Sequence, residues 1–369
     1  MRSNRLRMQI LSLSRFNPHH IRIKMDMVPR PESGLFSVVD KLLANAEKTP
    51  ALQTVSLRFS GSAHKELRRD GPCVVELLTG LFSACVERGV CGRVCDPDIC
   101  PLHGHLRQWE SVVTTTHTPQ ACQDEKVEEL LRHGGVPPSL RPRVWAYLTH
   151  SASKRIDGLY ADMEKQTSRL LLSDTNRDVA NFARRHTELS SSMLTKILKA
   201  FLAFSKAPYT PNLVSIAGLI LLQTPNPEDA FWTFTSLMTT HLSAFQSRIE
   251  EHATLVAKHL ETKDPELATK LFIDLAILPV SLFRPWFANV FVGTLPDEHL
   301  LHVWDWLLYQ GPEFLLRTAV AILTLDDVKT ALLEADSQAA AMTIVLDLPA
   351  SLLPKEAEVF VGKVFTVKW

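Results

Sequence analysis

An arginine that follows an aspartate by three residues is the group in this sequence best placed to act on a phosphate. In the stretch LLSDTNRDV, Asp174 can cap a helix, and Arg177 then lies on the same side, within reach of the Asp174 carboxylate. One interpretation is a surface ion pair beside a helix cap, which contributes well under ~1 kcal/mol. The other is an arginine held rigidly so that its planar fork can reach a partner's phosphate.

A loop rich in cysteine and histidine is a candidate for a zinc site. Zinc takes four thiolate or imidazole ligands, usually supplied as two close pairs. No Cys-x-x-Cys pair is present, and the candidates fall within one short segment that would make a cramped cage. Free thiols in an irregular segment are the alternative, so we assign no metal. The weak candidates are Cys91, Cys95, Cys100, His103 and His105.

Two prolines bracket a tyrosine in the segment APYTPNLV, between two helical patterns. Thr210 is a suitable N-cap, and Pro211 is a suitable first residue of a helix. The residues that follow form one apolar helical face. These are Leu213, Ile216, Ala217, Ile220 and Leu221. As local structure, the segment is therefore a helix-helix turn.

A second arginine lies four residues before a tryptophan in LLRHGGVPPSLRPRVWAYL. We expect one helix to end at Gly134 and Gly135, and Ser139 to cap the next. Arg141 and Trp145 then share a face of that helix, where the guanidinium can lie against the indole. Taken alone, this pair is more often structural than catalytic.

From about residue 124 onward, the chain repeatedly shows residues that are typical of helix starts and helix ends. Asn226 is a suitable N-cap, followed by Pro227 and two acids in the first turn, and Gly311 ends another helical pattern. Short connections between many helices predict an all-α domain over residues 124–369. We find no period-two alternation long enough to build a sheet.

The N-terminal third has two further regions. Residues 1–32 form a basic arm that we expect to be disordered, with a mitochondrial transit peptide as the alternative. Met25 and Met27 leave open a natural start further along the chain. Residues 33–123 form a poorly defined, mostly helical or irregular region, with helices expected over 33–50 and 73–90.

Charge and composition exclude several classes of function. Lys plus Arg and Asp plus Glu each number 40 in the 369 residues, so no global field favours nucleic acid or an acidic membrane. The six cysteines all lie in the first third, which suits a reducing cytosol. The longest uncharged run is interrupted by prolines, and we expect no transmembrane segment. Phosphate-binding glycine loops and zinc-protease or esterase motifs are absent, so we expect no enzyme activity of its own.

The order and spacing of several sequence blocks resemble a TBC (Tre-2/Bub2/Cdc16) domain over roughly residues 126–325. The blocks are GVPPSLRPRVW, LLSDTNR, LTKILKAFLAF, PEDAFWTFTSLM and LPDEHLLHVWDWLLYQG, and the last is followed by LLRTAVAIL. The resemblance implies an all-α fold of many helices and activation of Rab-type small GTPases. Members of the family insert an arginine finger and a glutamine finger beside the nucleotide of the GTPase.

The arginine finger of the family belongs to an I-x-x-D-x-x-R motif. By resemblance, this motif falls on Leu171, Asp174 and Arg177, with leucine in place of isoleucine. Asp178 follows where the family usually has threonine. The resemblance therefore implies that Arg177 is catalytic and that its neighbours support it.

Of the other two family motifs, one is present in this sequence and the other lacks its glutamine. The R-x-x-x-W motif matches Arg141 and Trp145, which the resemblance places in support of the finger groove. The Y-x-Q motif falls on Tyr209, Thr210 and Pro211, so a proline stands where the glutamine finger belongs. Proline has no side-chain donor and cannot position water.

The resemblance leads to one expected function and two alternatives. We expect a Rab GTPase-activating protein with a single finger, whose partner holds the GTP and Mg²⁺. We expect it to be cytoplasmic and to act in vesicle trafficking, with peripheral association with endomembranes through its partner as a further option. One alternative is a catalytically degenerate TBC domain that binds a GTPase or acts as a scaffold, like the TBC subunit of the tuberous sclerosis complex, with subunits of a Rheb-type regulatory complex as partners. The other is a metal-binding adaptor.

Overall fold

The chain divides into two compact units in a computed structural model. The model describes residues 8–13, 20–25, 54–59, 91–92, 101–115, 125–165 and 172–368. One unit comprises residues 1–111 and 137–139, and the other comprises residues 112–136 and 140–369.

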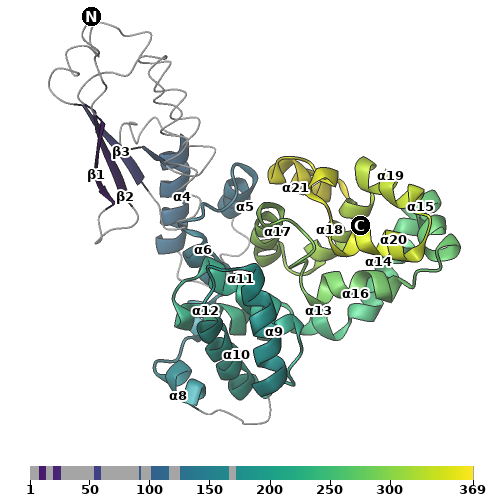
Figure 1. Cartoon of the computed structure of the whole chain (residues 1–369), viewed down its shortest axis with the longest axis horizontal. Helices are drawn as coiled ribbons and strands as arrows, with labels where there is room; N and C mark the ends of the chain where they lie inside the picture. The colour runs from purple at the N-terminus through teal and green to yellow at the C-terminus, as the bar shows by residue number, and fades with distance from the viewer. Residues whose placement is uncertain are drawn as a thin grey trace, which may run out of the picture. The chain divides into compact units, whose positions relative to one another are not determined.

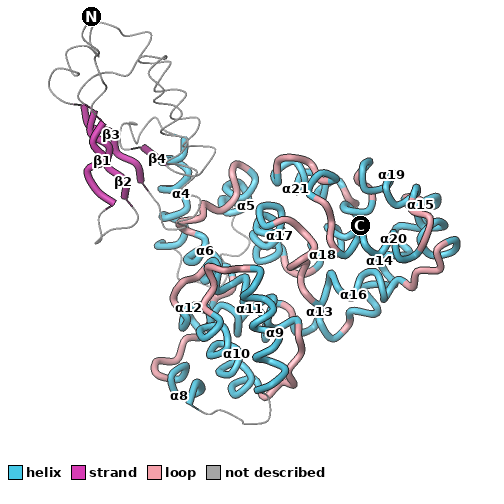
Figure 2. The backbone as a smooth tube through the Cα atoms, viewed as in Figure 1, coloured by secondary structure: helices cyan, strands magenta, loops and turns pink. Residues whose placement is uncertain are grey.

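The first unit contains a four-stranded sheet in the order β1-β2-β3-β4 (Figures 1 and 2). β1 and β2 are antiparallel, whereas β2 with β3 and β3 with β4 are parallel. Helix α4 begins in the same unit. The elements are β1 (Met8–Leu13), β2 (His20–Met25), β3 (Thr54–Phe59), β4 (Cys91–Gly92) and α4 (Pro101–Thr115).

This sheet corrects the expectation that the chain contains no sheet, and two of its strands lie in the segment 1–32 that was expected to be disordered. The sequence signal was present but short. In β2, Ile21, Ile23 and Met25 alternate with polar residues, and β3 shows the same pattern from Thr54 to Phe59. Six residues of alternation are enough for a strand. The helices expected over 33–50 and 73–90 lie outside the described residues.

Every described element of the second unit is helical, which confirms the all-α class for this part of the chain (Figure 2). The helices are α5 (Glu125–Arg132), α6 (Arg141–Leu148), α7 (Ser151–Lys154), α8 (Leu159–Lys165), α9 (Leu172–Arg185), α10 (Ser191–Ser205), α11 (Asn212–Gln223), α12 (Pro227–Ser236), η4 (Leu237–His241), α13 (Ser243–Ser247), α14 (Ile249–Lys263), α15 (Pro265–Thr269), η5 (Lys270–Asp274), α16 (Pro279–Ala288), α17 (Asp297–Gln310), α18 (Glu313–Leu323), α19 (Asp326–Glu334), α20 (Gln338–Leu346), η6 (Ala350–Leu352) and α21 (Ala357–Thr366).

Local signals set some helix ends where the sequence predicts them, but two expected caps are wrong: the N-cap of α6 is Leu140 and not Ser139, and Asp174 lies inside the first turn of α9. The Asn226 side chain accepts hydrogen bonds from the backbone N–H groups of Glu228 (2.9 Å) and Asp229 (3.2 Å), so it caps α12. Gly311 ends α17 with a φ of 91°, a conformation that glycine adopts without strain. The short connections between helices therefore follow from residues at their ends.

The core of the second unit is rich in aromatic side chains. Trp145 on α6 stacks on Trp304 on α17, with ring centroids 5.4 Å apart, and both are fully buried. The Trp304 indole N–H donates to the carbonyl of Val290 (3.0 Å), so its polar atom is satisfied in the core. This stack joins α6 to α17, helices that are far apart in sequence.

No single helix within the described residues is both long and apolar enough to cross a membrane. The segments 265–274 and 279–288 reach the required length and composition only when taken together, and they are bent by 105° at the break between them.

Candidate functional site

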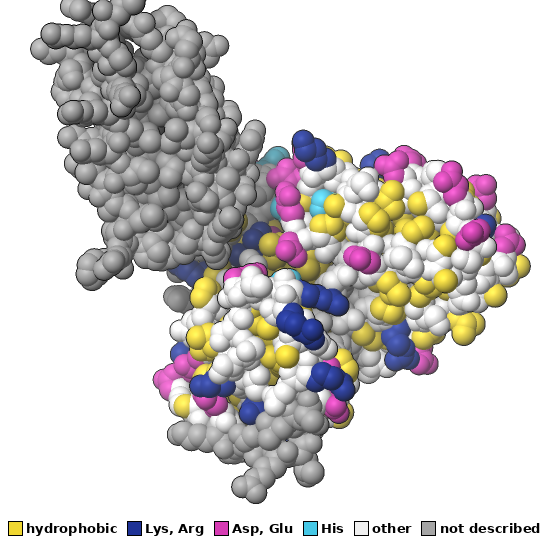
Figure 3. Space-filling view, viewed as in Figure 1, with side chains coloured by type: hydrophobic (Ala, Val, Ile, Leu, Met, Phe, Trp, Pro, Cys, Tyr) yellow, Lys and Arg dark blue, Asp and Glu magenta, His cyan; other side chains and the backbone are white. Residues whose placement is uncertain are grey.

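Helix α9 presents Arg177 to solvent because its opposite face packs on the rest of the unit. Thr175 and Val179 are buried at 3% and 2% exposure, and Phe182 on the same face is half-buried. Successive helical residues lie about 100° apart, so Arg177 points away from this face. Its side chain is 65% exposed. Figure 3 shows several basic side chains on the surface above α9 and α11.

A glycine allows α9 to approach α11 closely. A Cβ atom added at Gly218 on α11 would lie only 2.3 Å from Cε1 of Phe182 on α9. No side chain larger than hydrogen fits there without a shift of the ring. The position of α9, and therefore of Arg177, depends on this contact.

Two carboxylates on the same helix hold the Arg177 guanidinium. Arg177 Nε donates to Asp178 Oδ1 (3.1 Å), and Arg177 Nη1 lies 3.3 Å from Asp174 Oδ1. The hydrogen bond to Asp178, and then the charges of Asp178 and Asp174, raise the pKa of Arg177 above its ordinary value. Neither contact uses Nη2. The predicted Asp174–Arg177 pair is therefore confirmed, but Asp178 adds a second contact that the sequence analysis did not predict.

Asp178 also connects α9 to the segment between α10 and α11. The Tyr209 hydroxyl donates to Asp178 Oδ2 (2.8 Å), so one carboxylate accepts from Arg177 and Tyr209 together. Burial, and then the hydrogen bond and the charge of Asp178, raise the pKa of Tyr209. In the sequence, Asp178 stands out only as a departure from the family motif. The signal in the sequence that could have indicated this role is a carboxylate directly after the arginine, which can accept from the tyrosine of the other family motif.

Pro211 lies at the start of α11 close to this network along the chain. Its φ of −58° and ψ of −30° are helical, and its ring is exposed. The helix begins at Asn212, and Pro211 takes the cap position that was expected for Thr210. Backbone bonds close the first turn, because Leu213 N donates to the Thr210 carbonyl (3.1 Å) and Val214 N to that of Pro211 (3.1 Å). The Y-x-Q position therefore supplies a tyrosine hydroxyl but no side-chain amide.

Arg141 and Trp145 lie in the core and not in an exposed groove. The Arg141 Nε and Nη2 atoms each donate to an oxygen of Asp305 (3.3 Å), and Nη2 also donates to the Val136 carbonyl (2.9 Å). The Trp145 indole N–H donates to Asp305 Oδ1 (2.6 Å). The guanidinium therefore binds a carboxylate, in contrast to the expected stacking on Trp145. Burial of Arg141 (4% exposed) and Asp305 (1% exposed) makes this motif a link between α6 and α17.

The remaining candidates lie partly outside the described residues. Cys95, Cys100 and Leu171 are not described, nor are the side chains of Cys91 and His103. The His105 Nε2 atom accepts a hydrogen bond from the Trp109 indole (3.1 Å). Within the residues that the structure describes, no group of three or more His, Cys, Asp or Glu side chains could hold a metal ion. The weak zinc candidates stay a prediction.

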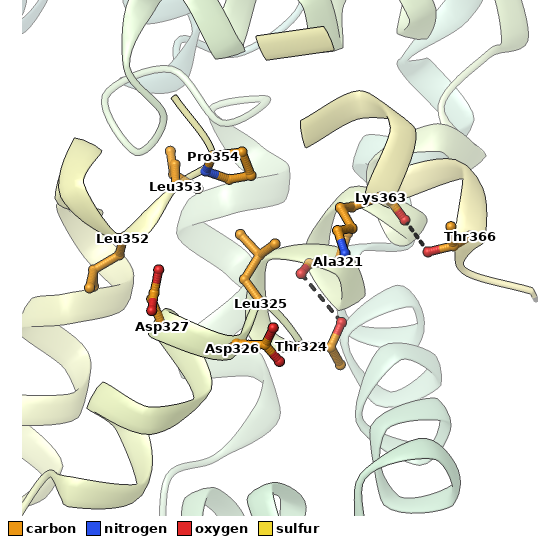
Figure 4. Close-up of a pocket in the computed structure, with 10 residues that line it drawn as sticks. All are labelled: Ala321, Thr324, Leu325, Asp326, Asp327, Leu352, Leu353, Pro354, Lys363 and Thr366. Atoms are coloured by element: carbon orange, nitrogen blue, oxygen red, sulfur yellow. Dashed lines mark hydrogen bonds between the residues drawn. The ribbon is translucent and has the colours of Figure 1, made fainter. Parts of the chain in front are cut away.

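A cavity of about 310 Å³ lies elsewhere in the second unit, between α18, α19, η6 and α21 (Figure 4). Its apolar lining includes Leu325 and Leu353, and Figure 4 shows Asp327 and Lys363 on opposite sides of Leu325. None of the residues predicted from the sequence lines it. The cavity is therefore separate from the network on α9.

Known proteins resemble this chain in sequence. The family model described as the Rab-GTPase-TBC domain matches residues 138–329, more than half of the chain. TBC1 domain family member 2A of Mus musculus is 30% identical over 231 residues, which are 56% of this chain and 24% of that protein. TBC1 domain family member whacked of Drosophila melanogaster is 25% identical over 231 residues, which are 59% of this chain and 63% of that protein. The chain thus spans about a quarter of the length of the former relative.

Solved structures show the same fold. The flagellar RabGAP TBC domain of Chlamydomonas matches with a TM-score of 0.57 at 22% identity, covering 71% of this chain and 90% of that domain. The Ypt/Rab-GAP domain of Gyp1p matches with a TM-score of 0.54 at 16% identity, covering 71% of this chain and 98% of that domain. Together with the family match, they confirm the resemblance seen in the sequence. The chain belongs to the Rab-GTPase-TBC domain family.

Proposed function

We propose that this protein is a GTPase-activating protein for a Rab-type small GTPase and that Arg177 is its arginine finger. The observation that carries the proposal is that the Arg177 side chain is both exposed and held in place by carboxylates. Its side chain is 65% exposed, while Asp178 holds its Nε atom and Asp174 its Nη1 atom. A finger must be accessible to a partner and also oriented before the partner arrives, and Arg177 meets both conditions. Family membership supports the class of partner.

The chemistry follows from the charge that develops during phosphoryl transfer. The γ-phosphoryl oxygens carry this charge, and a guanidinium that donates to them stabilises the transition state. An arginine supplied by a partner in this way is worth ~10³ to 10⁵ in rate. The GTP and Mg²⁺ would belong to the GTPase, so we propose no cofactor for this chain.

The attacking water needs a second group to position it. Pro211 cannot do so, because proline has neither a side-chain donor nor a backbone N–H. We propose that the glutamine of the GTPase itself positions the water, as it does in small GTPases generally. This chain would then contribute one finger.

A second candidate is a TBC domain that binds a GTPase or a complex without catalysis. The observation in its favour is the exposed ring of Pro211 at the position of the second finger. Such a domain would retain the surface that recognises the partner and lack the chemistry.

Single-turnover GTP hydrolysis by a panel of Rab-type GTPases separates the two candidates. The parent, Arg177→Ala and Pro211→Gln are compared, with Arg185→Ala as a control that removes the same charge from an exposed position on the same helix. Acceleration by the parent that Arg177→Ala abolishes and Arg185→Ala leaves intact would support the one-finger activator. No acceleration by the parent, with a gain in Pro211→Gln, would favour the non-catalytic domain.

A further inference from the structure

Asp178 joins the candidate arginine finger, Arg177, to Tyr209, the tyrosine of the Y-x-Q motif. Its Oδ1 accepts from Arg177 Nε at 3.1 Å, and its Oδ2 accepts from the Tyr209 hydroxyl at 2.8 Å. The two partners come from different segments, since Tyr209 precedes α11 and Arg177 lies on α9. The carboxylate therefore fixes the arginine relative to a second element and not merely along its own helix.

Asp178 is a stronger anchor for Arg177 than Asp174. The Asp178 side chain is 17% exposed, whereas that of Asp174 is 69% exposed. An ion pair in full solvent is screened and contributes little, and a partly buried pair is screened less. Asp178 is further held by the tyrosine, so its own position is defined.

The contacts leave part of the guanidinium for another ligand. Arginine has five N–H donors in a planar fork, and the two acids engage Nε and Nη1. Neither of these contacts uses Nη2. A guanidinium fixed at Nε keeps its plane constant, which lowers the entropy lost when Nη2 donates to a phosphate oxygen.

We infer that Asp178 is a positioning residue for Arg177: it fixes the guanidinium plane through Nε, with Tyr209 bracing the carboxylate, so that the Nη2 edge meets the partner's γ-phosphate. The inference rests on the proposed function for its catalytic consequence. The contact between Asp178 and Arg177 has a consequence of its own, which is measurable without a GTPase.

The kinetic test uses Asp178→Ala and Asp178→Asn in the full chain, with Asp327→Ala as a control that removes the same charge from an exposed position on α19. We expect Asp178→Ala to lower the maximal rate of stimulated GTP hydrolysis about tenfold, because a finger that rotates freely is seldom aligned. The GTPase concentration at half-maximal rate should change less than about twofold, since positioning acts on the transition state and not on binding. Asp178→Asn retains one acceptor oxygen and should fall between the parent and Asp178→Ala.

A double-mutant cycle shows whether Asp178 acts through Arg177. In an Arg177→Ala background, Asp178→Ala should cause no further loss. A further loss of the same size would mean that Asp178 acts by another route and would overturn the inference. A faster Asp178→Asn variant would also overturn it, because the carboxylate charge would then oppose the phosphate more than the hydrogen bond helps.

A spectroscopic measurement separates failure of this inference from failure of the proposed function. The Nε–H group of Arg177, assigned by its loss in Arg177→Lys, should give a slowly exchanging NMR signal in the free parent and a rapidly exchanging one in Asp178→Ala. If no GTPase is stimulated by the parent, the proposed function fails, and this signal alone decides the anchoring contact. A signal that is unchanged in Asp178→Ala overturns the inference whatever the kinetics show.

Discussion

The contact between Gly218 and Phe182 offers a sharp test of how α9 is placed. In Gly218→Ala, the new methyl group would lie 2.3, 2.7 and 2.8 Å from three ring atoms of Phe182. Ordinary contact begins near 3.4 Å, so the ring or the helix must move by about 1.1 Å, the difference between 3.4 and 2.3 Å. The clash is with ring atoms of Phe182, a half-buried side chain, so both the ring and α9 can move to relieve it.

The free energies of the substitution oppose each other. Overpacking typically costs about 1 to 3 kcal/mol. Replacing a helical glycine by alanine stabilises by about 1 kcal/mol. The net expectation for Gly218→Ala is a loss of about 0 to 2 kcal/mol in the free energy of unfolding. Gly362 on α21 is the matched control, because an added Cβ there meets no atom within 4 Å.

Two assays check this expectation. Denaturant unfolding should show Gly362→Ala more stable than the parent and Gly218→Ala lower than Gly362→Ala by about 1 to 3 kcal/mol. Stimulated GTP hydrolysis should fall in Gly218→Ala, since a misplacement of about 1 Å can cost up to about 10²-fold. Adding Phe182→Leu should restore both quantities in part. If Gly218→Ala stabilised the protein as much as Gly362→Ala does, Phe182 would yield freely and the close approach would not control α9.

Two further predictions concern stability. Asp305→Ala should lower the free energy of unfolding by about 3 to 5 kcal/mol, because it leaves the buried Arg141 guanidinium without its carboxylate; a loss below ~1 kcal/mol in denaturant titrations would contradict this role. Stability should also decrease as pH falls below about 6.5. Burial lowers the pKa of His241 in the folded state. The unfolded chain, in which this histidine has its ordinary pKa of 6.5, therefore binds the proton more readily. His241→Gln should reduce that slope between pH 7 and 5.5, and an unchanged slope would assign it to other groups.

Strands were harder to predict from this sequence than helices. Helix ends such as Asn226 and Gly311 carry their own signals, because the cap bond and the φ angle depend on neighbouring residues. β2 and β3 show six residues of alternation each, but their hydrogen-bond partners lie on other segments of the chain. A strand of this length forms only when a partner strand is present, so pairing had to be known first.

The sequence alone determined the features that depend on near neighbours along the chain. The spacing of Asp174 and Arg177 puts both on one side of a helix, and Pro211 cannot donate a hydrogen bond in any fold. The sequence blocks also identified the family. These conclusions needed only helical geometry, residue chemistry and motif order.

Tertiary structure decided which distant groups share a carboxylate. Asp178 and Tyr209 are 31 residues apart, and Arg141 and Asp305 are 164 residues apart. Whether such groups meet depends on how the helices pack, as the approach of α9 to α11 at Gly218 illustrates. Packing placed the predicted groove residue Arg141 in a core ion pair and made Asp178 the link between Arg177 and Tyr209. Long-range contacts of this kind are set by the whole arrangement of helices and not by local spacing.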